Sequence, residues 1–204
     1  MVAADSNFDR HAARDKYKAH CEKMLEERET NMKVVYENKK ENVKIWGSYN
    51  EDGLMETVEI CENTDLDLQD LRGMFYPIQE YVDTCNRADE SAVTSLLKIL
   101  DEPKEEYLMF IDLKLPWPMS NRIGMYYMFM GLDDGSTDVY FSEGTQQYHD
   151  EYKEKIGDKV IMDFKFIYTK FTPRKEGKGF TYEKVQSFAL NGSVPKTIVN
   201  WANK

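Results

Sequence analysis

Residues 115–122 read LPWPMSNR, and this stretch separates two apolar segments, residues 107–115 and residues 122–132. Pro116 and Pro118 each fix the backbone φ angle and lack the N–H group that a strand contributes to its hydrogen-bond ladder. They therefore predict the end of one strand and a corner before the next. Two strands joined by so short a corner are expected to be neighbours in an antiparallel sheet.

Arg122 brings a permanent charge to the start of the second of these strands. A partly buried guanidinium must find acceptors, and its planar fork suits carboxylate and phosphate groups. Candidate acceptors within the protein are Asp112 and Glu143; in a ligand they would be a phosphate or a carboxylate. The sequence leaves open whether Arg122 forms a structural ion pair or contacts the polar end of a bound molecule.

Further strands are predicted on the C-terminal side of the corner, at residues 137–142, 159–171 and 180–190. In KVIMDFKFIYTKF, residues 159–171, apolar and polar side chains nearly alternate, which is typical of a strand with one buried face. The apolar face of this strand is predicted to comprise Val160, Met162, Phe164, Phe166 and Tyr168.

The N-terminal half is predicted to contain helices and one hairpin. The runs VKIWGSY and LMETVEIC flank NEDG at residues 50–53, which supplies the turn of the hairpin. Good helix formers with a thin apolar stripe predict a surface helix at residues 9–31, within an N-terminal segment 1–35. More helices are predicted at residues 65–72, 74–87 and 90–100, and a last one opens at Ser193 and Pro195. The fold class is therefore α+β, an antiparallel sheet with helices at the start, middle and end of one domain, 1–204.

Composition excludes several classes of protein. The chain has 204 residues with 41% hydrophobic and 13% aromatic content, which argues against disorder, and a net charge of −10, which opposes nucleic-acid binding. Its longest apolar stretch, residues 123–132, is about half the length of a membrane-spanning helix. The charged N-terminus differs from a secretory signal, so a cytoplasmic location is expected.

The sequence offers no positive argument for catalysis. The histidines, His11, His20 and His149, have no metal-ligand partners at helix or strand spacing. The cysteines, Cys21, Cys61 and Cys85, are odd in number and form no CxxC pair, so buried or idle thiols are expected. Nucleophile-elbow, phosphate-loop and dinucleotide-binding motifs are missing from the sequence. We expect no catalytic residues, no metal and no cofactor.

A local basic cluster stands out in this acidic chain, in the segment KFTPRKEGKGF. Its members are Lys170, Arg174, Lys175 and Lys178. A solvated hairpin loop is one interpretation. The other is transient docking at an anionic membrane surface, which such a cluster favours.

Two motifs resemble those of the StAR-related lipid-transfer (START) domains, especially phosphatidylcholine-transfer proteins. The first is PWPMSNR, and the second is NGSVPKTIVNWANK at residues 191–204, similar to the junction of last strand and lid helix. The resemblance covers most of residues 40–204. It implies a helix-grip fold, in which a curved antiparallel sheet wraps around a C-terminal helix and encloses an apolar cavity for one lipid. Ile123 stands where the family usually has an acidic residue, so head-group specificity is not transferred.

The resemblance implies non-catalytic binding, and intermembrane transfer, of a phospholipid-like or sterol-like molecule. The residues predicted to contact lipid are Ile111, Leu113, Arg122, Tyr126, Met128, Met162, Phe164, Phe166, Tyr168, Ile198 and Trp201. An ordinary filled core is the alternative for the apolar residues of this set. The last helix is short up to Lys204, which predicts either a longer natural chain or a cavity open at one end.

Two other functions remain open at this point: a helix-grip enzyme, such as a cyclase or hydrolase acting on a hydrophobic substrate, and an interaction module with a vestigial cavity. A lipid ligand and a transient membrane surface are the expected partners. The lipid class, the membranes served and the oligomeric state are left open by the sequence.

Overall fold

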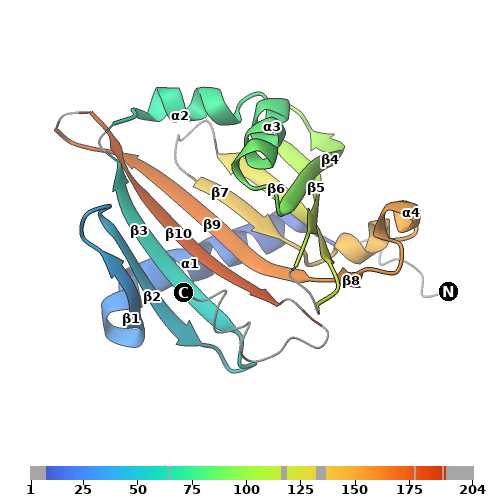
Figure 1. The fold of residues 1–204 in the computed structure, drawn as a ribbon, viewed down its shortest axis with the longest axis horizontal. Coiled ribbons are helices and arrows are strands. Elements are labelled where there is room, and N and C mark those ends of the chain that lie inside the picture. The colour runs from blue at the N-terminus through green and yellow to red at the C-terminus, as the bar shows by residue number, and fades with distance from the viewer. Residues whose placement is uncertain are drawn as a thin grey trace.

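The computed structural model describes residues 8–63, 65–115, 119–131, 137–176, 178–189 and 191, and these form one large sheet with helices on both faces (Figure 1). The strands are β1 (Lys33–Asn38), β2 (Val43–Tyr49), β3 (Met55–Asn63), β4 (Ala92–Asp101), β5 (Glu106–Leu113), β6 (Arg122–Gly131), β7 (Thr137–Phe141), β8 (Val160–Ile161), β9 (Asp163–Pro173) and β10 (Phe180–Ala189). Their order is β1-β2-β3-β10-β9-β7-β6-β5-β4, antiparallel throughout, with β8 beside β6 in parallel.

The helices are α1 (Arg10–Asn31), α2 (Leu68–Phe75), α3 (Ile78–Ala88), the 3-10 turn η1 (Thr145–Tyr148) and α4 (Lys153–Ile156). Helix α1 crosses one face of the sheet, while α2 and α3 cover part of the other (Figure 1). This arrangement confirms the predicted α+β class. The last predicted helix, at residues 193–204, lies outside the described residues.

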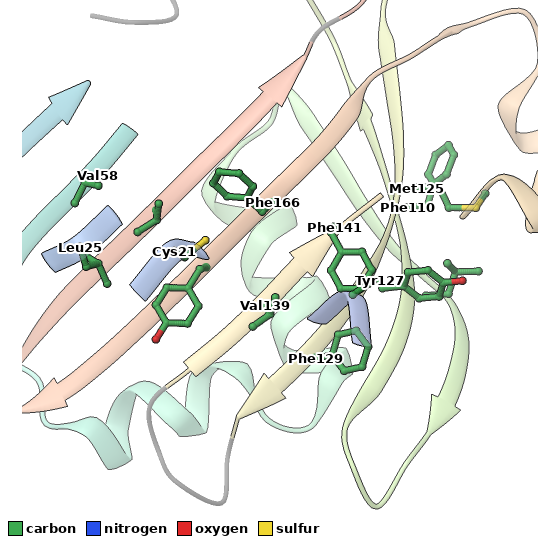
Figure 2. Close-up of a cluster of buried hydrophobic side chains, with 14 of the residues drawn as sticks. Cys21, Leu25, Val58, Phe110, Met125, Tyr127, Phe129, Val139, Phe141 and Phe166 are labelled. Carbon is green, nitrogen blue, oxygen red and sulfur yellow. The ribbon is translucent and has the colours of Figure 1, made fainter. Parts of the chain in front are cut away.

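Helix α1 covers the first face of the sheet. Asp9 caps it by accepting hydrogen bonds from the backbone N–H groups of His11 and Ala12, each at 3.0 Å. Cys21 and Leu25 from the helix are buried against aromatic and aliphatic side chains of the strands (Figure 2). The helix is polar elsewhere, so burial of this narrow stripe holds it on the sheet.

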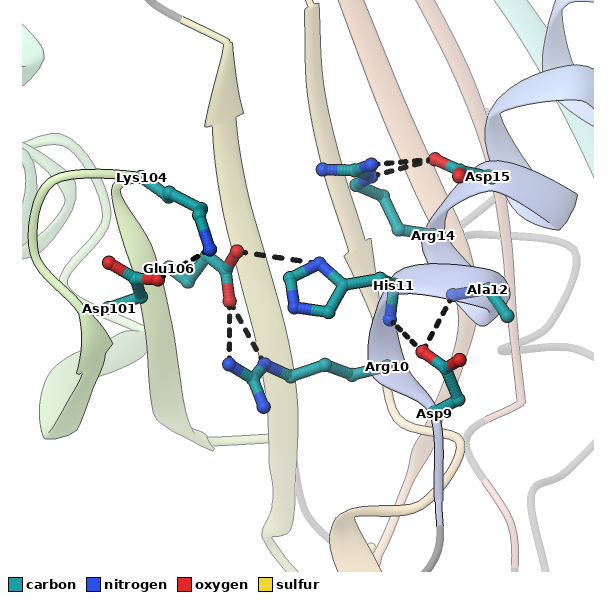
Figure 3. Close-up of polar contacts among 9 residues, drawn as sticks. All are labelled: Asp9, Arg10, His11, Ala12, Arg14, Asp15, Asp101, Lys104 and Glu106. Carbon is teal, nitrogen blue, oxygen red and sulfur yellow. Dashed lines mark hydrogen bonds and ion pairs between the residues drawn. The ribbon is translucent and has the colours of Figure 1, made fainter.

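A buried ion pair fastens the start of α1 to β5. The Glu106 side chain is 1% exposed, and Nε and Nη2 of Arg10 both lie 2.9 Å from its Oε2 atom (Figure 3). Nδ1 of His11 lies 3.5 Å from Oε1 of the same carboxylate. Nearby, Lys104 pairs with Asp101 at 2.9 Å. The first turn of α1 is thus tied to the β4–β5 hairpin through Glu106.

Strand β6 is buried on both faces, which explains why IGMYYMFM reads as a continuous apolar run. Ile123, Met125, Tyr127 and Phe129 join the cluster under α1. The intervening residues Tyr126, Met128 and Met130 pack on the other face together with Ile78 and Val82 of α3. A strand in the middle of a sheet with helices on both sides has no solvated face, so its sequence does not alternate.

A β-bulge at Lys165 reverses the pattern of β9. Ser187 of β10 pairs with Phe166 and Phe188 pairs with Phe164, so that Lys165 is the extra residue. Phe164 and Ile167 consequently belong to the face under α3, whereas Phe166 and Tyr168 lie under α1. The prediction that the apolar residues of this strand share one face is therefore wrong, because they are divided between the two faces of the sheet.

Residues 90–100 were predicted as a helix and form strand β4 instead, so that prediction is wrong. Its register with β5 shifts twice, between Leu96 and Lys98 and between Ile99 and Asp101. These bulges bring apolar residues together at spacings that imitate a helix. Backbone pairing with β5 along the whole segment makes it a strand rather than a helix. Strand β1 was also missed by the sequence prediction. Its pairing with β2 contains a similar irregularity, between Val34 and Tyr36.

Most of the other predicted elements are confirmed, although η1 and α4 were not predicted and the strand expected at residues 159–171 is divided between β8 and β9. The helix at residues 9–31, the hairpin of β2 and β3, and the later strands lie within a few residues of their expected bounds. In the part of the chain that the structure describes, no helix combines the length and apolar character that crossing a bilayer requires.

Candidate lipid-binding cavity

A cavity of about 610 Å³ lies between helices α2 and α3 and the face of the sheet beneath them. Its described lining residues come from both helices and seven strands. They are Cys61, Asn63, Leu71, Tyr81, Cys85, Ala88, Asp89, Ala92, Thr94, Ile111, Tyr126, Asp138, Tyr140, Phe164, Ile167, Thr169, Phe171, Phe180, Tyr182 and Lys184. The wall is largely apolar and aromatic with a few polar groups, which is the usual character of a site for a hydrophobic ligand.

Aromatic side chains form one part of the wall. The Tyr126 ring lies 5.0 Å from that of Phe164 and 6.0 Å from that of Tyr140, measured between centroids. Burial raises the pKa of Tyr81, Tyr126, Tyr140 and Tyr182 above the usual tyrosine value. These four side chains therefore remain neutral at physiological pH and offer hydroxyl groups within an otherwise apolar space.

A polar row crosses the floor of the cavity. Glu59 of β3 pairs with Lys184 of β10, Lys184 pairs with Thr169 of β9, and Thr169 pairs with Asp138 of β7. Asp138 accepts hydrogen bonds from the Gly131 N–H at 3.2 Å and from the hydroxyls of Tyr140 and Thr169 at 3.3 Å. The cavity thus contains a carboxylate and an amine two strands apart in one row.

Two of the three cysteines, Cys61 and Cys85, also line the cavity. Burial is the main cause that raises the pKa of each thiol above its usual value. A thiol with a raised pKa is a poor nucleophile, because the thiolate is the reactive form. Among the described residues, no group of three His, Cys, Asp or Glu side chains is arranged to hold a metal ion.

Comparison with solved structures shows which fold surrounds this cavity. Human STARD10 superposes with a TM-score of 0.68 at 14% sequence identity, over 99% of this chain and 76% of that one. Human StAR-related lipid transfer protein 5 gives 0.67 at 13% identity, over 95% and 89% of the two chains. A STAR-related lipid transfer protein fragment from Xanthomonas axonopodis gives 0.61 at 17% identity, over 84% and 89%.

The chain folds as a START-like domain. The fold predicted from the PWPMSNR and NGSVPKTIVNWANK motifs is thereby confirmed. No family model matches the sequence, and no curated protein matches it. The START-like fold is therefore recognisable from the structure, whereas comparison of the sequence alone found no match.

The START-like domain brings some of the predicted lipid-contacting residues to the cavity and places others elsewhere. Ile111, Tyr126 and Phe164 line it. Met162 is buried beside Phe164 and Ile111, and Met128 is fully buried in the cluster under α3. Leu113 is partly buried, two residues beyond Ile111 on β5.

Phe166 and Tyr168 lie on the opposite face of the sheet from the cavity. Both belong to the cluster under α1, and the Tyr168 hydroxyl donates to Glu22 of that helix at 3.4 Å. The bulge at Lys165 is the physical reason for this placement. Ile198 and Trp201 fall outside the described residues.

Arg122 connects Ser120, just before β6, to Asn191, just after β10. Its side chain is about 1% exposed, and its guanidinium donates to the carbonyl and hydroxyl oxygens of Ser120 at 2.6 and 2.8 Å and to the Asn191 carbonyl at 3.1 Å. The two carboxylates considered from the sequence have other neighbours, since Asp112 pairs with Lys159 and Glu143 lies 3.5 Å from Lys16. The described contacts of Arg122 thus join two segments of the chain, at Ser120 and Asn191.

The basic cluster occupies the hairpin between β9 and β10. Lys170 belongs to β9, while Arg174, Lys175 and Lys178 are exposed at the turn. The Lys178 ammonium lies 3.8 Å from the Asp70 carboxylate of α2. Phe171 and Phe180, at the base of the same hairpin, line the cavity. The basic turn is thus at one end of the cavity.

Sequence reasoning missed the helix α3 and strand β10 contributions to the wall. On α3, Tyr81 and Cys85 are four residues apart and so share one face of the helix. On β10, Phe180, Tyr182 and Lys184 alternate along one face of the strand. Both spacings were available in the sequence, where residues 180–190 were predicted as a strand without assignment of its faces.

Proposed function

We propose that this START-like domain binds one lipid molecule in the cavity and carries it between membranes without chemical change. The observation that supports this function is the cavity itself, a largely apolar space of about 610 Å³ with hydroxyl groups on its wall. A filled core would have no such space, because protein interiors are packed to crystal-like density. Ile111, Tyr126 and Phe164 are the predicted lipid contacts that belong to this wall.

Filling the cavity tests the proposal. Ala92 of β4 lines the cavity, and Ala92→Trp would place an indole in the space for the ligand. We expect the variant to bind lipid at least about tenfold more weakly, because the added volume competes directly with the ligand. The measurement is native mass spectrometry after incubation with mixed phospholipid and sterol vesicles.

Ala19→Trp is the matched control, since Ala19 is exposed on α1, on the other side of the sheet. It should bind lipid as the parent protein does. Circular dichroism shows whether each variant folds. If the folded Ala92→Trp protein takes up lipid fully, or the parent protein takes up none, lipid carriage through this cavity is refuted.

We further propose that the exposed basic turn docks the domain on anionic membranes. The support is its place at one end of the cavity, in a protein of net charge −10. Basic side chains near an anionic surface contribute about 1 kcal/mol each, and the attraction falls off within a Debye length. A lipid entering or leaving beside this turn would meet the bilayer directly.

Neutralising two charges of the turn tests this docking. Arg174→Gln with Lys175→Gln should weaken binding to phosphatidylserine vesicles by roughly 30-fold at low salt, since about 2 kcal/mol is lost. Vesicle co-sedimentation measures the effect. Lys39→Gln with Lys40→Gln, at the exposed β1–β2 turn, is the control of equal charge. An equal loss in both double variants would mean that only net charge matters.

A further inference from the structure

Lys184 of β10 lines the cavity, and its cross-strand neighbour is Glu59 of β3. Among the described residues that line this space, it is the only lysine or arginine. Among the residues that the structure describes, no carboxylate lies within ion-pair distance of its ammonium and no hydrogen bond to that ammonium is found. An ammonium in a largely apolar space is costly, so this position increases the fraction of Lys184 that is the free amine.

Several titratable groups surround Lys184, and their charges do not offset the free-energy cost of burying its ammonium. Burial is the main cause that lowers the pKa of its ammonium, and the nearby charge of Glu59 on β3 opposes that shift. Asp138 on β7 faces Thr169 in the same row, and its oxygens already accept three hydrogen bonds. Tyr182 and Cys61 are neutral neighbours in the adjacent row, with raised pKa values.

The row also disfavours an anionic ligand at Lys184. Glu59 and Asp138 both lie in it, one on either side of the amine, so a phosphate or carboxylate placed there would approach two negative charges. A neutral ligand group that reacts with a free amine suits the position better. A carbonyl group has that chemistry, and an apolar tail behind it would occupy the rest of the cavity.

We propose that Lys184 captures lipid aldehydes or ketones as an imine on the floor of this cavity. The inference rests on the proposed function, because the ligand must first enter the lipid-binding space. It adds covalent retention of a reactive lipid to simple carriage. Lysine is the side chain suited to this role, since an unprotonated amine is a good nucleophile toward carbonyl carbon.

The reaction needs no oxidant or reductant. The Lys184 nitrogen lone pair attacks the carbonyl carbon, a C–N bond forms, and the carbonyl π electrons move to oxygen. A proton passes from nitrogen to that oxygen, which gives a carbinolamine. The hydroxyl group then leaves with a proton as water while the C=N bond forms. Amine and aldehyde thus yield imine and water, and water reverses the reaction when the lipid is released.

Reductive trapping tests the proposal. The parent protein is incubated with hexadecanal and cyanoborohydride, which converts any imine to a stable secondary amine, and the modified lysines are mapped by peptide mass spectrometry. We expect labelling of Lys184 to be at least about tenfold faster than that of exposed lysines, because its free-amine fraction is larger. Lys184→Arg should lose this label, and Lys23→Arg, on the exposed side of α1, should keep it.

Hexadecanol, which has the same chain but no carbonyl, separates this inference from the proposed function. Uptake of hexadecanol together with selective label at Lys184 supports both. Hexadecanol uptake with label absent from Lys184, or spread evenly over surface lysines, refutes imine capture and leaves lipid carriage intact. If neither molecule is taken up, both proposals are refuted. The mapping on the parent protein stands even if Lys184→Arg fails to fold.

Discussion

Arg122→Met is expected to lower the free energy of unfolding by about 3 kcal/mol. Each hydrogen bond from a charged group contributes roughly 1.5–3 kcal/mol, and removal of the buried charge offsets part of the loss of these bonds. The guanidinium holds Ser120 at the proline corner and Asn191 after β10, two points 71 residues apart in the chain. Methionine fills similar space and donates to neither. Urea denaturation measures the difference.

Two comparisons define the role of Arg122. Arg122→Lys should recover less than half of the loss, because one ammonium cannot reproduce a planar fork directed at both Ser120 and Asn191. Arg174→Met, at an exposed position, should change stability by less than about 0.5 kcal/mol. If Arg122→Met instead keeps its stability and changes which lipids are bound, the guanidinium contacts the ligand rather than the chain.

Arg10→Met is expected to destabilise the protein by about 2–3 kcal/mol, since it leaves the carboxylate of Glu106 buried without its main partner. The partial exposure of Arg10 keeps the figure below that of a fully buried pair. Thermal and urea unfolding measure it. Hydrogen exchange should also show earlier opening of the first turns of α1, because the Arg10–Glu106 pair fastens that end of the helix to β5.

The double variant Arg10→Met with Glu106→Leu is the informative control. Replacing both members of a buried ion pair by apolar groups is often neutral, so the double variant should be more stable than Arg10→Met alone. Strict additivity of the two single effects would show that Arg10 and Glu106 act independently, contrary to the geometry in Figure 3.

The sequence predicted the fold where local chemistry and tertiary structure agree. The NEDG turn at residues 50–53 marks the reversal between β2 and β3, because it supplies backbone chemistry that a strand cannot continue. Residues 116–118 lie outside the described residues, but β5 and β6 on either side of them pair antiparallel, as the two prolines predicted. The helix at residues 9–31 follows from its good helix formers and thin apolar stripe, and the structure adds the Asp9 cap. Together with the START resemblance, these features were sufficient for the fold class.

The faces of the strands were harder to predict, because bulges have no sequence signal that can be read without the partner strand. The extra residue at Lys165 moves Phe166 and Tyr168 away from the cavity, and two irregularities made β4 resemble a helix. A cavity is harder still, since the same apolar residues line an empty space or fill a core. Of the residues predicted to contact lipid, Ile111, Tyr126 and Phe164 line the cavity, while the polar row of β10 and β7 was not among the predicted residues.

The irregularities of the edge strands β1 and β4 also bear on aggregation of the protein. The sheet ends at β1 and β4, and each edge exposes β-branched side chains, with Val34 at 48% and Val93 at 44% exposure. An open edge with such side chains is a template on which strands of other molecules can add, the first step toward fibrils. Both edges carry a register irregularity, which interrupts the straight hydrogen-bonding run that such addition needs. The distortions that hid β4 from sequence-based prediction thus make the edges of this large open sheet less suited to the addition of strands from another molecule.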